Sequence, residues 1–184
     1  VFVQMKISVI HSADDMDEIV PRISTFANTQ NKIQVADFSA NDPFHRRIEE
    51  LSRTIWAPAQ GGMKPRNWFY ERARGQYADM LTRESTTKRK KEYKETHPLF
   101  TKTDLAKYEN TWDQLPWQVS EGAQKNFHKF MLRLKERKGF SPDEIYYQNL
   151  IAKAILFRQT EKLVQKQQYG GYRANIVTYT LAFL

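Results

Sequence analysis

In the first ten residues, VFVQMKISVI, every second side chain is apolar, and Phe2 and Ile10 add apolar side chains on the other face. Positions 1, 3, 5, 7 and 9 are apolar, which is the two-residue period of a half-buried strand. Apolar residues then recur every three or four positions and predict a helix from Ser12 or Asp15 to about Asn28. Pro21 lies inside that pattern and lacks a backbone donor, so we expect a kink or a late helix start.

The next apolar pattern has a strong start signal, because the N-cap carboxylate of Asp42 precedes a proline at the first helical position. We predict a helix from Pro43 to about Trp56, ended by Pro58 and the glycine pair that follows. The apolar residues on one face of this helix are Phe44, Ile48, Leu51 and Ile55.

The middle of the chain holds shorter elements. NWFYERARG, residues 67–75, favours a strand or strand–turn, with Gly75 at a positive φ. A polar, mostly basic stretch follows from Arg83 to Lys94. Thr101-x-x-Asp104 then predicts the start of a short helix. The apolar residues of that helix are Leu105, Tyr108 and Trp112.

The last third of the chain shows helical spacing. A helix is predicted after Ser120, with an exit at Gly139 and with Ala123, Phe127, Phe130, Met131 and Leu134 facing inward. Ser141-Pro142-Asp143-Glu144 combines a capping box with a proline and starts a helix that extends toward Val164. Its apolar residues are Ile145, Leu150, Ile151, Ala154 and Ile155. We predict a further helix after Tyr172, although residues 176–180 favour a strand.

These elements predict an α+β fold, with a small N-terminal sheet contribution followed by a mainly helical C-terminal half. We divide the chain into an α+β part at 1–82, a basic connecting segment at 83–100 and a helical part at 101–184. The chain starts inside a strand pattern and stops at apolar YTLAFL, so we expect it to be a segment of a longer protein whose remaining strands lie upstream.

Composition narrows the functional classes. The net charge of +8 favours a polyanionic partner such as nucleic acid. The chain has no cysteine, so neither a disulfide framework nor a thiolate metal site is available, in keeping with a cytoplasmic protein. No apolar run reaches the roughly 20 residues of a membrane-spanning helix, and we expect no membrane partner.

No catalytic or cofactor signature is evident. The histidines lack metal-ligand spacing, and the glycine pairs lack the spacing of a phosphate loop. His45 and Glu49 lie one helical turn apart, which favours a surface hydrogen bond over a metal site. We therefore predict no catalytic residue, no metal and no cofactor within these residues.

Three stretches are candidates for binding. Asn28, Gln30 and Asn31 either cap the end of a helix or form a polar surface whose amides bind bases or a nucleotide. WFYERARGQY, residues 68–77, is either a buried strand whose Glu71 pairs with an arginine or a stacking and phosphate-contacting surface. The second interpretation makes candidates of Glu71, Arg72 and Arg74.

The third stretch is TTKRKKEYK, residues 86–94, which contains Lys88, Arg89, Lys90 and Lys91. Such a run is usually solvated surface. If it does touch nucleic acid, it contacts phosphates, and binding is then sensitive to salt and indifferent to sequence.

Taken in order, these segments resemble the AIPR family of abortive infection phage resistance proteins. TFANTQNKIQVADFSANDPFHRRIEEL resembles the stretch in which an Asn-x-Gln-Asn element precedes a helix start, and WFYERARGQY resembles the Tyr-Glu-Arg element. FTKTDLAKY and YRANIVTYTLA resemble later segments, so the likeness spans nearly the whole chain. A more distant likeness, to ParB-like modules, bears only on the fold.

The resemblance implies a role in bacterial antiphage defence within a longer cytoplasmic protein. It also raises the expectation that Asn28, Gln30 and Asn31 line one groove with Glu71 and Arg72. The leading hypothesis is a module that contacts nucleic acid. The alternatives are the accessory half of a nuclease or nucleotide-processing enzyme with catalytic residues upstream, and a sensor module that binds a phage or self protein.

Overall fold

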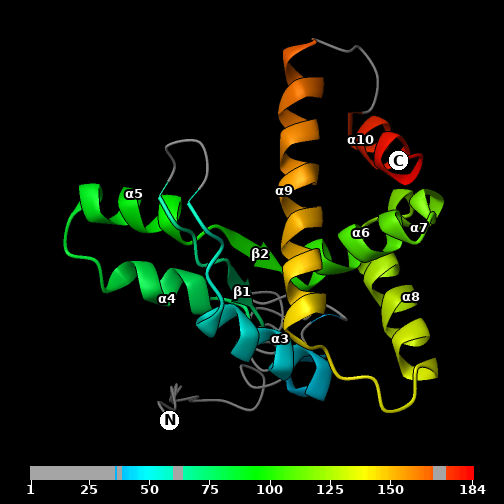
Figure 1. Cartoon of the computed structure of the whole chain (residues 1–184), viewed down its shortest axis with the longest axis horizontal. Helices are drawn as coiled ribbons and strands as arrows, with labels where there is room; N and C mark the ends of the chain where they lie inside the picture. The colour runs from blue at the N-terminus through cyan, green and yellow to red at the C-terminus, as the bar shows by residue number, and fades with distance from the viewer. Residues whose placement is uncertain (1–35, 37–38, 60–63, 168–172) are drawn as a thin grey trace, which may run out of the picture. The chain divides into compact units, whose positions relative to one another are not determined.

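The computed structural model describes residue 36 and residues 39–59, 64–167 and 173–184 (Figure 1). The chain divides into two units, Val1–Gln34 and Val35–Leu184, and all described residues belong to the second. The strand predicted at 1–10 and the helix predicted between Ser12 and Asn28 lie outside the described residues.

The described unit is mostly helical, with one short pair of strands. In chain order its elements are η1 (Ser39–Asn41), α3 (Pro43–Thr54), β1 (Phe69–Glu71), α4 (Gln76–Thr82), α5 (Thr87–Thr96), β2 (Leu99–Thr101), α6 (Lys102–Trp112), α7 (Pro116–Ser120), α8 (Ala123–Glu136), α9 (Glu144–Lys166) and α10 (Arg173–Ala182). The predicted α+β class with a mainly helical C-terminal half is confirmed.

The two strands pair in parallel, with Tyr70 opposite Phe100. Strand β1 confirms the strand–turn predicted for 67–75, and Gly75 has a φ of 91° as expected. Strand β2 was not predicted, and neither was helix α5, because both lie in the stretch interpreted as a basic connection. Three residues are too few to show an alternating pattern, so β2 is recognisable only beside its partner strand.

Helix α3 begins as predicted. The Asp42 carboxylate accepts a hydrogen bond from the Phe44 amide at 2.9 Å, and Pro43 occupies the first helical position. The helix ends at Thr54, two residues earlier than predicted, and the chain then pairs Ala57 with Arg66 in an antiparallel bridge.

Helix α6 also begins as predicted, with a capping box formed by Thr101 and Asp104. Leu105 and Tyr108 are buried in the core. Trp112 is 46% exposed, because it is the last residue of the helix and lies beside the Lys153 ammonium, 5.7 Å from its ring centroid.

The helix starts in the last third need two corrections. Ser120 ends helix α7, which was not predicted, and helix α8 starts after Gly122 instead. Asp143, and not Ser141, caps α9 by accepting from the Tyr146 amide at 2.7 Å. Asp143 directly precedes Glu144, the first helical residue, so its carboxylate and not the Ser141 hydroxyl caps the helix.

The predicted inward faces of α8 and α9 are mostly confirmed. Phe127, Phe130 and Met131 are buried on α8, but Ala123 at its start is exposed. On α9, Ile145 and Ile155 are 68% and 41% exposed. These two isoleucines lie on flanks of a long helix whose core-facing stripe is narrower than its apolar pattern. The helix predicted after Tyr172 is confirmed as α10.

One hydrophobic core joins the strands to the helices. It includes Ile48 of α3, Tyr70 and Phe100 of the strands, Leu105 of α6 and Leu150 of α9. Helix α6 packs against α8 and α9, and α10 packs against α9 and α7. Within the described ranges, no helix combines the length and apolar character that crossing a bilayer requires.

Candidate nucleic-acid interface

The candidate residues fall into two groups. Asn28, Gln30 and Asn31 lie outside the described residues, so their predicted roles as a cap or a polar surface remain predictions. The other group lies at the end of β1 and on α5, and its geometry follows.

The aromatic residues of the Tyr-Glu-Arg element belong to the core. Trp68, Phe69 and Tyr70 are 2%, 3% and 0% exposed, so their rings are not available to stack on bases. The Arg53 guanidinium covers the Phe69 ring at 3.7 Å from its centroid. The interpretation of this stretch as a buried strand is therefore correct for its aromatic residues.

Glu71 holds the turn that follows β1. Its Oε1 atom accepts hydrogen bonds from the backbone amides of Gly75 and Tyr77, each at 3.2 Å. These amides lie at the N-terminus of α4, where a carboxylate satisfies unpaired donors and complements the helix dipole. Glu71 thereby fixes the angle at which α4 leaves the sheet.

Arg72 lies in a partly buried polar network. Its Nε donates to Glu49 Oε2 at 2.5 Å, and its Nη1 donates to the Ala40 carbonyl at 2.6 Å. Glu49 Oε1 also accepts from Gln76 Nε2 at 2.8 Å and lies 3.5 Å from the Arg53 guanidinium. The Arg72 and Glu49 side chains are each about one-fifth exposed, so this guanidinium serves first to join α3 to the turn after β1.

Sequence reasoning did not select Glu49 as the partner of Arg72, because 23 positions separate them and the pairing depends on the packing of α3 against β1. The one sequence signal that could have pointed to Glu49 as a site residue was its position on the same helical face as His45.

His45 corrects the prediction of a surface hydrogen bond with Glu49. The His45 side chain is fully buried, its Nδ1 lies 2.6 Å from the Tyr70 hydroxyl and its Nε2 lies 3.3 Å from the Met131 sulfur. Burial, together with the charges of Lys102 and Arg72, lowers the pKa of His45 from 6.5 to about 3. Among the described residues, no three His, Asp or Glu side chains gather in a way that would hold a metal ion.

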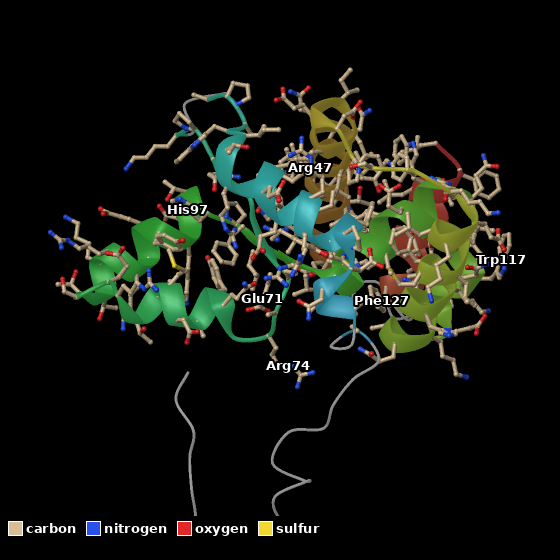
Figure 2. The ribbon with its side chains drawn as sticks, turned by 90° about the horizontal axis from the view of Figure 1, so that it is seen from below. Arg47, Glu71, Arg74, His97, Trp117 and Phe127 are labelled. Atoms are coloured by element: carbon tan, nitrogen blue, oxygen red, sulfur yellow. The ribbon has the colours of Figure 1, made fainter. Side chains whose placement is uncertain are left out.

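Arg74 is exposed, unlike Arg72. Figure 2 shows its side chain pointing away from the ribbon at the turn between β1 and α4. The cation therefore lies on the surface at the base of α4.

Helices α4 and α5 lie side by side and form an arm beside the sheet (Figure 1). The Tyr77 hydroxyl donates to the His97 carbonyl at 2.7 Å, and the centroids of the Tyr77 and Tyr93 rings lie 6.0 Å apart. These contacts attach the C-terminal end of α5 to α4. We call the two helices, Gln76–Thr82 and Thr87–Thr96, the basic arm.

The basic side chains of α5 are on its surface. Lys88, Arg89, Lys90 and Lys91 are all exposed, and no residue of α5 is buried. The helix carries five Lys or Arg and two Glu, a net charge of +3. Helical spacing places Lys90 and Lys94 on one face, whereas Lys88 and Lys91 each have a glutamate four positions later.

The whole chain, residues 1–184, matches the family model described as AIPR protein. This chain belongs to the AIPR family. The family's name denotes abortive infection phage resistance, so this is a domain of an abortive-infection phage-resistance protein. No curated protein and no solved structure matches it. Within this AIPR domain, the candidate residues that the structure describes are Glu71, Arg72, Arg74 and the basic side chains of α5.

Proposed function

We propose that this AIPR-family domain contacts nucleic acid through the basic arm, as part of antiphage defence. The observation that carries the proposal is the complete exposure of the basic run on α5. A helix without a buried residue keeps its lysine and arginine side chains in solvent, where they can reach phosphates.

The distribution of charge supports this proposal. Residues 35–184 contain 26 Lys or Arg and 17 Asp or Glu, a net charge of +9, whereas residues 1–34 contain 3 and 4, a net charge of −1. The excess positive charge of the chain therefore belongs entirely to the unit that carries the basic arm. Such a surface attracts a polyanion over long range at low salt.

The candidate residues take different parts in this proposal. Lys88, Arg89, Lys90 and Lys91, with Arg74 at the base of α4, contact phosphates. Glu71 and Arg72 hold the turn from which the arm leaves the sheet. A groove shared with the amides at positions 28, 30 and 31 remains a prediction.

The test uses a variant in which four basic side chains of α5 are replaced by glutamine, Lys88→Gln/Arg89→Gln/Lys90→Gln/Lys91→Gln, here called the α5 glutamine variant. Its binding to labelled duplex DNA and single-stranded RNA is measured by fluorescence anisotropy over a range of salt concentrations. Each lost duplex phosphate contact is expected to reduce the slope of log K against log salt by about 0.9. Up to four contacts are removed, so binding at low salt falls by orders of magnitude.

The matched control neutralises four exposed lysines on other helices, Lys125→Gln/Lys135→Gln on α8 and Lys162→Gln/Lys166→Gln on α9. The control removes the same net charge, so its salt slope changes little if the arm is the contact. Equal losses in both variants would assign binding to general charge and refute the arm as the site.

A second candidate function, the binding of a phage or self protein, is supported by apolar side chains on the last helices. Leu163 on α9 is 60% exposed, and Tyr179 on α10 is 43% exposed. Exposed apolar residues of this kind mark protein interfaces when they form a continuous patch. Leu163→Glu/Tyr179→Glu would abolish such an association and leave salt-dependent nucleic-acid binding unchanged.

A further inference from the structure

A cavity of about 340 Å³ lies between α9 and the chain on either side of the Ala57–Arg66 bridge. Its lining residues are Ile55, Trp56, Ala57, Pro58, Lys64, Arg66, Trp68, Tyr147, Gln148, Ile151, Ala152, Ile155 and Gln159. The six residues from α9 recur at helical spacing, so one continuous face of that helix forms a wall. The volume falls within the range of pockets for small organic ligands.

The walls of the cavity are apolar and aromatic, and they are held in place. The Tyr147 hydroxyl donates to the Trp68 carbonyl at 3.0 Å, and the Arg158 guanidinium lies 4.4 Å from the centroid of the Trp68 ring. Trp56 packs edge-on against His97 at 5.6 Å but remains 52% exposed. A partly exposed indole held in this way offers a planar ring a surface for stacking.

The Trp68 indole carries an unsatisfied donor. Its Nε1 is buried and has no hydrogen-bond partner among the described residues, although the side chain lines the cavity. A buried N–H without an acceptor costs about 1–3 kcal/mol, so native structures rarely leave one unexplained. Because Nε1 is closed to solvent, the Trp68 ring contributes to the cavity as an apolar wall.

The polar groups around the cavity indicate the charge of a ligand that it could hold. Lys64 and Arg66 contribute two cationic side chains, Gln148 and Gln159 contribute amides, and the described lining residues include no carboxylate. Cations at the edge of an aromatic cavity favour an anion attached to a planar ring. Amides can donate to and accept from the edge of a heterocyclic base.

We propose that this cavity binds a nucleotide, with the base between Trp56 and the α9 wall and the phosphate near Lys64. The site does not depend on the phosphate contacts proposed for the basic arm, because it uses none of the same side chains. A free nucleotide and the terminal nucleotide of a strand share this chemistry.

The test uses isothermal titration calorimetry on the 184-residue chain with AMP, GMP, adenosine and inorganic phosphate. Ala152→Phe places a ring in the cavity from an exposed helical position, and we expect it to weaken mononucleotide binding at least about tenfold, a change of 1.4 kcal/mol. The control Asn149→Phe adds the same ring at an exposed position of α9 outside the cavity and should leave binding unchanged.

A further variant tests the phosphate contact. Lys64→Gln should weaken AMP binding by about tenfold or more and leave adenosine unaffected, because it removes a partner of the phosphate only.

Absence of nucleotide binding by the wild-type chain at millimolar concentration would overturn the proposal, as would equal effects of Ala152→Phe and Asn149→Phe. A 5′-phosphorylated tetranucleotide, titrated into the α5 glutamine variant, distinguishes a free nucleotide from the terminal nucleotide of a strand as the ligand. Binding that is much tighter than that of AMP assigns the cavity to a strand end, and equal binding assigns it to a free nucleotide.

Discussion

At the scale of single residues, His45 and Tyr70 form a buried polar pair in the core. The Tyr70 hydroxyl lies 2.6 Å from His45 Nδ1, and the Met131 sulfur lies 3.3 Å from His45 Nε2. Sulfur only accepts, so the proton of a neutral imidazole belongs on Nε2 and the tyrosine donates to Nδ1. Burial also raises the pKa of Tyr70, so both partners are neutral near pH 7.

This pair predicts a specific loss of stability in acid. Because the pKa of His45 is about 3 in the folded protein and about 6.5 in the unfolded chain, only the unfolded chain takes up a proton between these values. Stability therefore falls as the pH drops below 6.5, by about 1.4 kcal/mol per pH unit, or about 2 kcal/mol at pH 5. Urea unfolding at pH 7 and pH 5 measures this loss of stability.

The variant His45→Gln is the comparison, because glutamine can still accept from Tyr70 but does not titrate. Between pH 7 and pH 5, the free energy of unfolding of this variant should fall by about 2 kcal/mol less than that of the wild type. Parallel losses in the two proteins would show that His45 takes up its proton as readily in the folded protein as in the unfolded chain.

At the scale of elements, two helices with similar caps differ in what they pack against. Thr86 caps α5 by accepting from the Arg89 amide at 3.2 Å, and Thr101 caps α6 in a reciprocal box with Asp104. Helix α6 buries residues against α8 and α9, whereas α5 buries none. The same local chemistry therefore supports the core in one case and a surface arm in the other.

Alanine at these two caps should separate the roles. Thr101→Ala is expected to lower the free energy of unfolding by about 1 kcal/mol, because the cap stabilises a helix that all of the core depends on. Thr86→Ala should leave the global transition nearly unchanged and instead increase amide exchange within α5. Calorimetry and hydrogen exchange measure the two effects, and equal shifts in melting temperature would contradict this division.

At the scale of the whole described unit, a sheet of only two strands is maintained by helices. A two-stranded pair is marginal in water by itself. Here Phe100 is fully buried, with ring centroids 5.0 Å from Tyr70 and 6.2 Å from Trp68, in the same core as α6 and α9. The core, more than the ladder of backbone bonds, holds β1 against β2.

Truncating Phe100 should therefore affect the whole unit. Phe100→Ala is expected to cost about 3–5 kcal/mol, a large part of the 5–15 kcal/mol that a domain of this size commonly has. Leu99→Ala, its neighbour on the opposite and less buried face of the strand, should cost clearly less. Denaturant midpoints compare the two, and similar costs would mean that Phe100 is not a core anchor.

Most of the described helices could be predicted from local signals. Asp42-Pro43 and Thr101-x-x-Asp104 place side chains and unsatisfied amides within four residues of one another, so the helix start is contained in the sequence around it. The α5 run was correctly interpreted as exposed for a related reason, since five cations in seven residues cannot be buried together.

The candidate site was less predictable, because its pairings join distant segments. Whether Arg72 faces a ligand or Glu49 depends on how α3 packs against β1, and the same packing takes His45 away from Glu49 and into the core. The cavity beside Trp68 likewise requires α9 to lie across the Ala57–Arg66 bridge. No pattern among neighbouring residues indicates that these distant segments lie against one another.

The sequence by itself determined the starts of α3 and α6, that the fold is α+β, that the basic run is solvated and, through the order of its segments, the AIPR resemblance. The tertiary structure decided that β2 exists, that the aromatic residues of β1 are buried, which arginine is tied to a carboxylate and where a cavity remains. The physical reason is the distance in sequence between the interacting residues. Helix caps and charge runs involve near neighbours, whereas burial and ion pairing depend on which distant segments fold against each other.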